Sequence, residues 1–344
     1  MTGLEPARRA WIESALGTPV EAARPIGQGA SRATWLVELA DREPVVLREE
    51  TGQGPMAGTP LDLAREAVVY RALGSTTLPV PAVLAVADDG AALLLAHARG
   101  EASWKGLDDD TVLAVSTDLG RCLAELHGLD PAGLELGPLA ADDDLEVWAS
   151  IAATRAPAPA TQIAAAALPW LAARAHDHGG PRSLCHGDAG AGNLLHEGGA
   201  VTALLDWEFA HLDDPHDDLA WVAVRNQVQR RPLDVGAVYR AWQAGTGRTI
   251  DPARLEHHRA LVLTRMLVSC DAALAWAGDG EPPMVQSMLR PYLGLAVVEA
   301  LRRAGATELP LDALAAEARA GWEGQPIAQV LDDPIDLDDL GGPW

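Results

Sequence analysis

The segment that decides the fold reads H-G-D-A-G-A-G-N at 186–193, D-W-E at 206–208 and D-P-H-D-D-L-A at 214–220. A short apolar run at 201–205, built from β-branched and aliphatic residues, precedes the second group and predicts a strand. Polar side chains therefore stand at fixed spacing around a strand. The pattern indicates a rigid frame that holds several carboxylates and one amide close together.

These side chains suit phosphoryl transfer. That reaction requires one carboxylate to orient the attacking hydroxyl and accept its proton, and oxygen ligands to hold Mg²⁺ against the phosphates. Asp188 suits the first role. Asn193 and Asp206 suit the second, because Mg²⁺ prefers a few hard oxygen ligands and keeps some of its waters. The alternative is that these Asp and Asn residues occur in loops by chance.

The order of these residues resembles the catalytic loop and metal-binding Asp of protein kinases, with Gly187 where those enzymes usually have Arg. H-G-D-x-x-x-x-N followed by D-W-E and D-P-x-x-D-L-A resembles the aminoglycoside phosphotransferase-like family. The V-L-R strand and D-W-E-F-A-H-L-x-D-P look closest to its branch linked to acyl-CoA dehydrogenases. The resemblance implies that Asp218 supports the catalytic loop. His186 is interpreted as a buried hydrogen-bonding residue of the frame, with a role as base as the alternative.

A glycine-rich segment, G-Q-G-A-S at 27–31, lies just before a predicted strand. Glycines let backbone N–H groups approach phosphates closely, and a serine hydroxyl adds a donor. Gly27, Gly29 and Ser31 are therefore predicted to bind the nucleotide. A glycine-rich turn in a hairpin is the commoner interpretation of such a segment taken alone.

Arg48 at the end of the next predicted strand and Glu66 in the next predicted helix complete the nucleotide side. Kinase-like folds place a basic residue there, on the phosphates and paired with a helix carboxylate. Arg48 departs from the usual Lys, and Arg binds phosphate bidentately with a different geometry. The alternative is a surface ion pair. The chain has no G-x-x-x-x-G-K-[ST], which excludes that other phosphate cradle.

The fold is predicted to be α+β, a protein-kinase-like architecture of two lobes. A small β-rich lobe is expected over 1–98, a larger α-helical lobe over 99–330 and an acidic tail over 331–344. Adenine is expected at the link between the lobes, 95–99. The strands and helices on which this rests are predicted at 34–39, 45–48, 83–87 and 91–96, and at 5–16, 61–73 and 111–127.

The formal charge of −23 repels nucleic acid and anionic membrane surfaces, so neither is expected as a partner. Three separated cysteines, Cys122, Cys185 and Cys270, lack C-x-x-C spacing and indicate reduced thiols in the cytoplasm. No signal peptide and no stretch of about 18 apolar residues is visible. The sequence leaves the oligomeric state open.

The predicted function is that of an ATP- or GTP-dependent O-phosphotransferase that uses Mg²⁺ and phosphorylates a hydroxyl of a small molecule. By resemblance, the acceptor is an aminoglycoside, a macrolide or a hydroxylated metabolite. It is expected to bind to the large lobe, because its hydroxyl must reach Asp188 in line with the γ-phosphate while the nucleotide fills the side facing the glycine-rich segment. Glu208 and Asp213 are candidates to meet a cationic acceptor, with solvated surface acids as the alternative. A pseudokinase that binds nucleotide without transfer is the other function considered. A His–Asp metallohydrolase is disfavoured, because no H-E-x-x-H or Cys/His quartet occurs.

Overall fold

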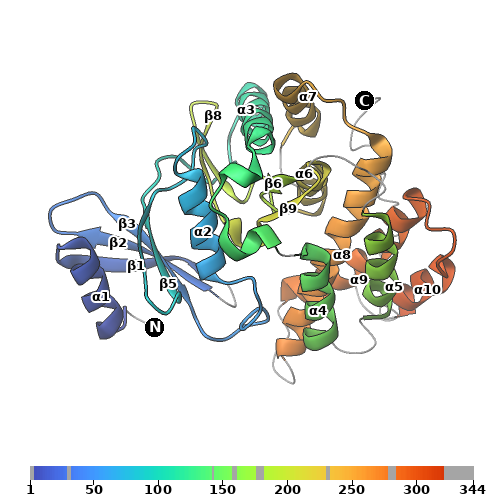
Figure 1. Ribbon diagram of the computed structural model, residues 1–344, viewed down its shortest axis with the longest axis horizontal. Coiled ribbons are helices and arrows are strands. Elements are labelled where there is room, and N and C mark those ends of the chain that lie inside the picture. Colours follow the sequence, from blue (N-terminus) through green and yellow to red (C-terminus); the bar gives the residue numbers. More distant parts are fainter. Residues whose placement is uncertain are drawn as a thin grey trace.

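The computed structural model describes residues 4–28, 32–141, 143–156, 161–175, 182–229, 233–277 and 284–320. The predicted acidic tail, 331–344, lies outside these residues, and so do Gly29 and Ser31. Within them the chain forms a β-rich part followed by a helical part (Figure 1). The α+β, kinase-like prediction is confirmed.

The first part is a five-stranded antiparallel sheet in the order β1-β2-β3-β5-β4. Two helices accompany it, and Figure 1 shows the second standing between the sheet and the rest of the protein. The strands and helices are β1 (Val20–Gln28), β2 (Arg32–Leu39), β3 (Val45–Glu50), β4 (Val83–Val86), β5 (Ala92–Ala96), α1 (Pro6–Leu16) and α2 (Leu63–Leu73).

Local chemistry explains where these elements begin and end. Helix α1 starts at Pro6, which lacks an N–H that the first turn would leave unpaired. It ends at Gly17, whose φ of 68° is the left-handed conformation that glycine adopts without a steric penalty. The Asp62 carboxylate caps α2 by accepting a hydrogen bond from the backbone N–H of Arg65. Strand β1 was not predicted from the sequence, and within it Gly27 pairs with Thr34 of β2.

The second part contains most of the helices and two small two-stranded sheets, β6–β9 and β7–β8. The sheet of the first part ends at Ala96 and the first of these helices begins at Asp109, while the lobe boundary at residue 98 stays a prediction. The elements are α3 (Asp109–Gly128), α4 (Asp144–Arg155), α5 (Thr161–Arg174), β6 (Ser183–Cys185), β7 (Leu194–Glu197), β8 (Ala200–Leu204), η3 (the 3₁₀ turn Trp207–Phe209), β9 (His211–Asp213), α6 (His216–Gln229), α7 (Val235–Thr246), α8 (Pro252–Ala277), α9 (Met284–Arg303) and α10 (Leu311–Ala320).

The core of the second part depends on close helix contacts. At Gly120 of α3, an added Cβ would lie 2.3 Å from the carbonyl oxygen of Val238 on α7, so only glycine permits this approach. The sequence showed no stretch of about 18 apolar residues, but helix α8 is long and apolar enough to cross a membrane by length and composition; 67% of its apolar window is buried inside the protein. Its apolar surface is therefore mostly covered by its neighbours.

A second apolar cluster joins the two parts. Leu61 and Met56, from the segment between β3 and α2, pack with Trp148 and Ile151 of α4. Arg155 of α4 adds a hydrogen bond of 2.7 Å from Nη2 to the carbonyl oxygen of Ala57. The segment after β3 therefore crosses to the helical part.

Candidate active site

The β7–β8 hairpin brings two predicted metal ligands together. Leu194 pairs with Leu204, and the backbone N–H of Leu205 donates to the carbonyl oxygen of Asn193 at 2.9 Å. Asn193 just before β7 and Asp206 just after β8 therefore lie at the same end of the hairpin. This pairing converts a separation of thirteen positions in the sequence into proximity in space.

The Asp188 carboxylate is held by the side chain of Asn193. Asn193 Nδ2 donates to Asp188 Oδ2 at 2.7 Å and to the Asp188 carbonyl oxygen at 3.0 Å. Since both contacts use the amide nitrogen, the amide oxygen of Asn193 is left to face other ligands. Burial raises the pKa of Asp188 to about 6, against the opposing effect of the Arg225 guanidinium.

Asp206 has an unusual backbone. Its φ is 66°, and among the described residues it is the one non-glycine residue with positive φ. Such conformations cost energy and occur preferentially at functional sites. Its side chain is 33% exposed, and Oδ1 accepts a hydrogen bond of 2.7 Å from Arg48 Nη2. Burial alone would raise the pKa of Asp206, but Arg48 holds it below its ordinary value.

The oxygens here form a donor set that fits Mg²⁺. The Asn193 amide oxygen and the partly exposed Asp206 carboxylate are hard neutral and anionic ligands, which this ion prefers. Two protein ligands would leave the remaining coordination positions of the ion to waters and phosphate oxygens. The fit depends on the amide nitrogen of Asn193 being occupied by Asp188.

A buried hydrogen-bond network centred on Asp218 supports the predicted catalytic loop. Asp218 accepts hydrogen bonds from the backbone N–H groups of His186 at 2.8 Å and Gly187 at 2.9 Å. His127 Nε2 lies 3.0 Å from the same carboxylate, and Trp242 Nε1 donates to His127 Nδ1 at 2.8 Å. The tryptophan donor requires Nδ1 to accept, so Nε2 carries the proton given to Asp218. Asp218 thus fixes two backbone groups at the start of the loop.

The His186 side chain is buried. Its Nε2 lies 3.0 Å from the carbonyl oxygen of Leu205, which requires an N–H there, and its ring stacks on Trp207 with centroids 4.4 Å apart. Burial lowers the pKa of His186 and disfavours its charged form. Its described contacts connect β6 with the end of β8.

On the nucleotide side, Arg48 Nη1 lies 2.9 Å from Glu66 Oε1. The alternative of a surface ion pair is wrong, because the Glu66 side chain is fully buried and that of Arg48 is 12% exposed. Arg48 Nε is a buried donor with no hydrogen-bond partner among the described residues. A buried, unpaired donor favours a further anionic ligand.

Arg32 was not predicted to be a site residue. This side chain begins β2 directly after the glycine-rich segment and is 6% exposed. It contacts Glu50 at 3.2 Å, Glu66 at 3.5 Å and the Glu208 carboxylate of the second part. The one available signal was its place at the start of a strand after glycines. Tyr70, whose hydroxyl accepts from the Asp206 N–H at 3.1 Å, carried no sequence signal.

The two acids considered for a cationic acceptor have internal partners. Glu208 is paired with Arg32, and burial raises the pKa of Glu208 to about 8, an effect that the charge of Asp206 reinforces. Asp213 lies 3.9 Å from Arg265. His211, Asp213 and Asp217 each place one potential metal-ligand atom within 4.8 Å of the others. Arg265, however, lies 2.5 Å from the Asp217 carboxylate and 3.9 Å from that of Asp213. A guanidinium in that position opposes a metal ion there.

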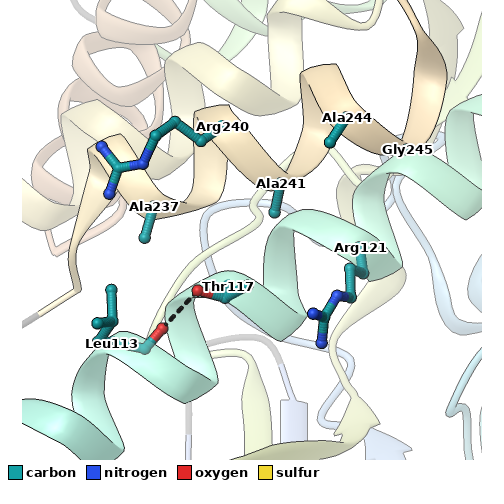
Figure 2. A pocket seen from close by; sticks show the side chains of 8 residues that line it. All are labelled: Leu113, Thr117, Arg121, Ala237, Arg240, Ala241, Ala244 and Gly245. Carbon is teal, nitrogen blue, oxygen red and sulfur yellow. Dashed lines mark hydrogen bonds between the residues drawn. The ribbon is translucent and has the colours of Figure 1, made fainter.

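A surface groove between α3 and α7 contains no predicted site residue (Figure 2). Apolar and small side chains from both helices line it, with arginines on each helix. At one side of it the Thr117 hydroxyl donates to the Leu113 carbonyl oxygen at 2.8 Å. The lining residues are Leu113, Thr117, Arg121, Ala237, Arg240, Ala241, Ala244 and Gly245.

The fold is kinase-like, and the carboxylates and the amide around the β7–β8 hairpin are the kinds of group that phosphoryl transfer requires. A profile of the phosphotransferase enzyme family matches residues 22–258. The chain belongs to this family.

One curated relative is similar in sequence. The chain is 28% identical over 233 residues to acyl-CoA dehydrogenase family member 10 of Mus musculus, covering 61% of this chain and 21% of that protein. The chain therefore spans about a fifth of the length of the curated relative it matches. The predicted likeness to that branch is confirmed.

Solved structures share the fold. One is a thermostable mutant of aminoglycoside phosphotransferase APH(4)-Ia in complex with AMP-PNP and hygromycin B, with TM-score 0.56 and 18% identity over 91% of this chain and 99% of that chain. Another is APH(2'')-IIa with streptomycin and ATP, with TM-score 0.57 and 12% identity over 88% and 97%. At these identities the likeness is one of fold.

Proposed function

We propose that this protein is an ATP- or GTP-dependent O-phosphotransferase that phosphorylates a hydroxyl of a small molecule. One observation carries the proposal. The Asp188 carboxylate is held by the amide nitrogen of Asn193, and Asn193 and Asp206 lie at the same end of the β7–β8 hairpin. A base and two metal ligands thus occupy one end of a hairpin, which is the arrangement that phosphoryl transfer requires.

Asp188 orients the acceptor hydroxyl and takes its proton. Asn193 and Asp206 hold Mg²⁺, which neutralises charge on the nucleotide phosphates when it is bound. Asp218 and His186 keep the loop in place through the backbone contacts described above. The lobes, 1–98 and 99–330, close on the nucleotide.

Arg48 binds the phosphates, with Glu66 holding its guanidinium. Support comes from the buried Nε of Arg48, which has no hydrogen-bond partner among the described residues. The contact of Arg48 with Asp206, the proposed metal ligand, also places the guanidinium beside the proposed metal site. Gly27, Gly29 and Ser31 add donors from the glycine-rich segment. Adenine or guanine binds at 95–99 through backbone groups.

The alternative is a pseudokinase. It is disfavoured because the base and both metal ligands are present and mutually arranged. In pseudokinases without transfer, the loss of one such group is the expected signature. A catalytic protein with Mg²⁺ as cofactor is the simpler conclusion.

The acceptor is an aminoglycoside, a macrolide or a hydroxylated metabolite, bound on the large-lobe side. APH(4)-Ia and APH(2'')-IIa have been solved with hygromycin B and streptomycin. The pairing of Glu208 with Arg32 and the nearness of Asp213 to Arg265 weaken the case for a strongly cationic acceptor. A cytoplasmic location, suggested by three buried free cysteines, is part of the proposal.

The test is nucleotide consumption by the whole chain with ATP or GTP, with and without Mg²⁺, across a panel of hydroxylated metabolites, aminoglycosides and macrolides. We expect Mg²⁺-dependent consumption that one acceptor class stimulates, with a phosphorylated product detected by mass spectrometry. Tight Mg·nucleotide binding without turnover on any acceptor or on water would support the pseudokinase instead. Amine-bearing acceptors are expected to compete no better than neutral ones.

A further inference from the structure

Arg225, on helix α6, reaches the catalytic loop from outside it. Its Nη1 donates to Asp188 Oδ2 at 2.6 Å and to the Asp188 carbonyl oxygen at 2.9 Å. The Arg225 side chain is 10% exposed and that of Asp188 18%. One guanidinium nitrogen therefore holds both the backbone and the carboxylate of the predicted base.

The loop has space for this side chain because of a glycine. A Cβ built on Gly190 would lie 3.2 Å from Arg225 Cδ and 3.4 Å from Arg225 Cβ. The shorter of these distances is tighter than ordinary van der Waals contact. The glycine two positions after Asp188 therefore lets the arginine lie along the loop with its charged end at the carboxylate.

The two donors to the Asp188 side chain converge on one oxygen. Arg225 Nη1 is 2.6 Å and Asn193 Nδ2 is 2.7 Å from Oδ2. Two donors from different elements, α6 and the start of β7, fix the rotation of the carboxylate about its Cβ–Cγ bond. Oδ1 then points in a direction that these contacts determine.

We propose that Arg225 is a positioning residue for phosphoryl transfer, a role that rests on the proposed function. By holding Oδ2 it presents Oδ1 to the acceptor hydroxyl. The acceptor oxygen bonds to the γ-phosphorus, the bond from that phosphorus to the bridging oxygen breaks, and the nucleoside diphosphate leaves with that electron pair. The hydroxyl proton passes to Asp188 Oδ1. Charge-assisted contacts to a buried carboxylate are strong enough to set such an orientation.

A merely structural role makes a different prediction. If Arg225 only anchors the loop through the carbonyl oxygen of Asp188, its loss acts equally whether or not residue 188 carries a carboxylate. If it positions the base, its loss matters only while the base is present. A double-mutant cycle separates the two.

The experiment measures Mg²⁺-dependent ATP hydrolysis, in which water takes the place of the acceptor hydroxyl, for Arg225→Met, Arg225→Lys, Asp188→Asn and the double variant. We expect Arg225→Met to lower kcat about 10²-fold, the loss typical of a misplaced reacting group, with the KM for ATP changed less than about twofold. Arg225→Lys recovers part of kcat. In the Asp188→Asn background, Arg225→Met removes little more. Arg121→Met, on the exposed face of α3, is the matched control and leaves kcat unchanged.

Retention of kcat in Arg225→Met, or an equal loss with and without the Asp188 carboxylate, overturns the proposal. A wild-type protein that binds Mg·ATP and turns over nothing contradicts the proposed function instead. In that case thermal unfolding of the wild type, Arg225→Met, Asp188→Asn and the double variant measures the coupling between Arg225 and Asp188 directly. Non-additive shifts of Tm support the contact, and additive shifts overturn it.

Discussion

Arg48 on β3 and Asp206 after β8 are joined across the two parts of the chain by a hydrogen bond of 2.7 Å between Nη2 and Oδ1. The residue predicted to bind phosphates therefore touches a residue predicted to bind the metal. Glu66 holds the other terminal nitrogen of Arg48 at 2.9 Å. Glu66, Arg48 and Asp206 thus form a chain of three charged groups. Phosphate binding by Arg48 and metal binding by Asp206 are tested separately by substituting each residue.

Arg48→Ala should weaken triphosphate binding far more than adenosine binding. The guanidinium is proposed to contact phosphate oxygens, and one charge-assisted contact contributes about 1.5–3 kcal/mol, or roughly 10- to 100-fold in affinity. Calorimetry with ATP and with adenosine measures this, with the exposed Arg71→Ala on α2 as control. An equal loss for both ligands would mean that Arg48 holds the fold together instead.

Asp206→Ala should remove the part of nucleotide affinity that depends on Mg²⁺. The carboxylate is proposed to bind the ion, so binding measured in excess chelator should change less than binding measured in Mg²⁺. The exposed Asp88→Ala, in the β4–β5 turn, should behave as wild type. If affinity falls by the same factor under both conditions, Asp206 is structural.

Asp188→Asn should retain the fold and nucleotide binding and lose transfer. Removal of a positioned base typically costs about 10²–10⁴ in rate. Circular dichroism and calorimetry check the first two properties, and product formation checks the third. Turnover near that of wild type would rule out Asp188 as the base.

Asp218→Asn should destabilise the protein. Three donors point at this carboxylate, from His127, His186 and Gly187, and an amide nitrogen in its place would face at least one of them. A buried donor left without an acceptor costs about 1–3 kcal/mol. Urea unfolding measures the loss, with the fully exposed Asp312→Asn as control. Unchanged stability in Asp218→Asn would show that the network tolerates an amide.

His211 should make the free energy of unfolding depend on pH. Burial opposes its charged form, but Asp144 and Asp217 raise the pKa of His211 to about 9, while Arg265 opposes them. Its Nδ1 lies 2.8 Å from the Phe209 carbonyl oxygen. The pKa of this imidazole in the unfolded chain is about 6.5. The stabilisation that charged His211 gives the folded protein is therefore complete below pH 6.5 and is lost as the pH rises to about 9.

Between these two pKa values, the contribution of His211 to the free energy of unfolding falls by about 1.4 kcal/mol per pH unit at most. The stability difference between wild type and His211→Gln should therefore shrink from pH 6 to pH 9. Chemical denaturation at pH 6, 7.5 and 9 measures it. The exposed His97→Gln serves as control. A difference that stays constant with pH would mean that His211 is neutral in the folded protein.

The sequence by itself determined the class of fold and the residues on the loop. The motifs between His186 and Asp218 carried the family resemblance, and with it the fold, while the strand predicted at 201–205 corresponds to β8. The strands and helices predicted for the first part are confirmed, and β1 is the strand of its sheet that was not predicted. Local alternation and three- to four-residue periodicity carry that information.

Tertiary structure decided the partners of those residues. Arg32 contacts Glu208 although they are 176 positions apart, and Arg225 contacts Asp188 across 37. Arginines at such distances leave no periodic or motif signal, because their role depends on how β2 and α6 pack against the hairpin. The order of residues along the chain predicted which groups perform the chemistry, and only the packing determined which arginines contact them.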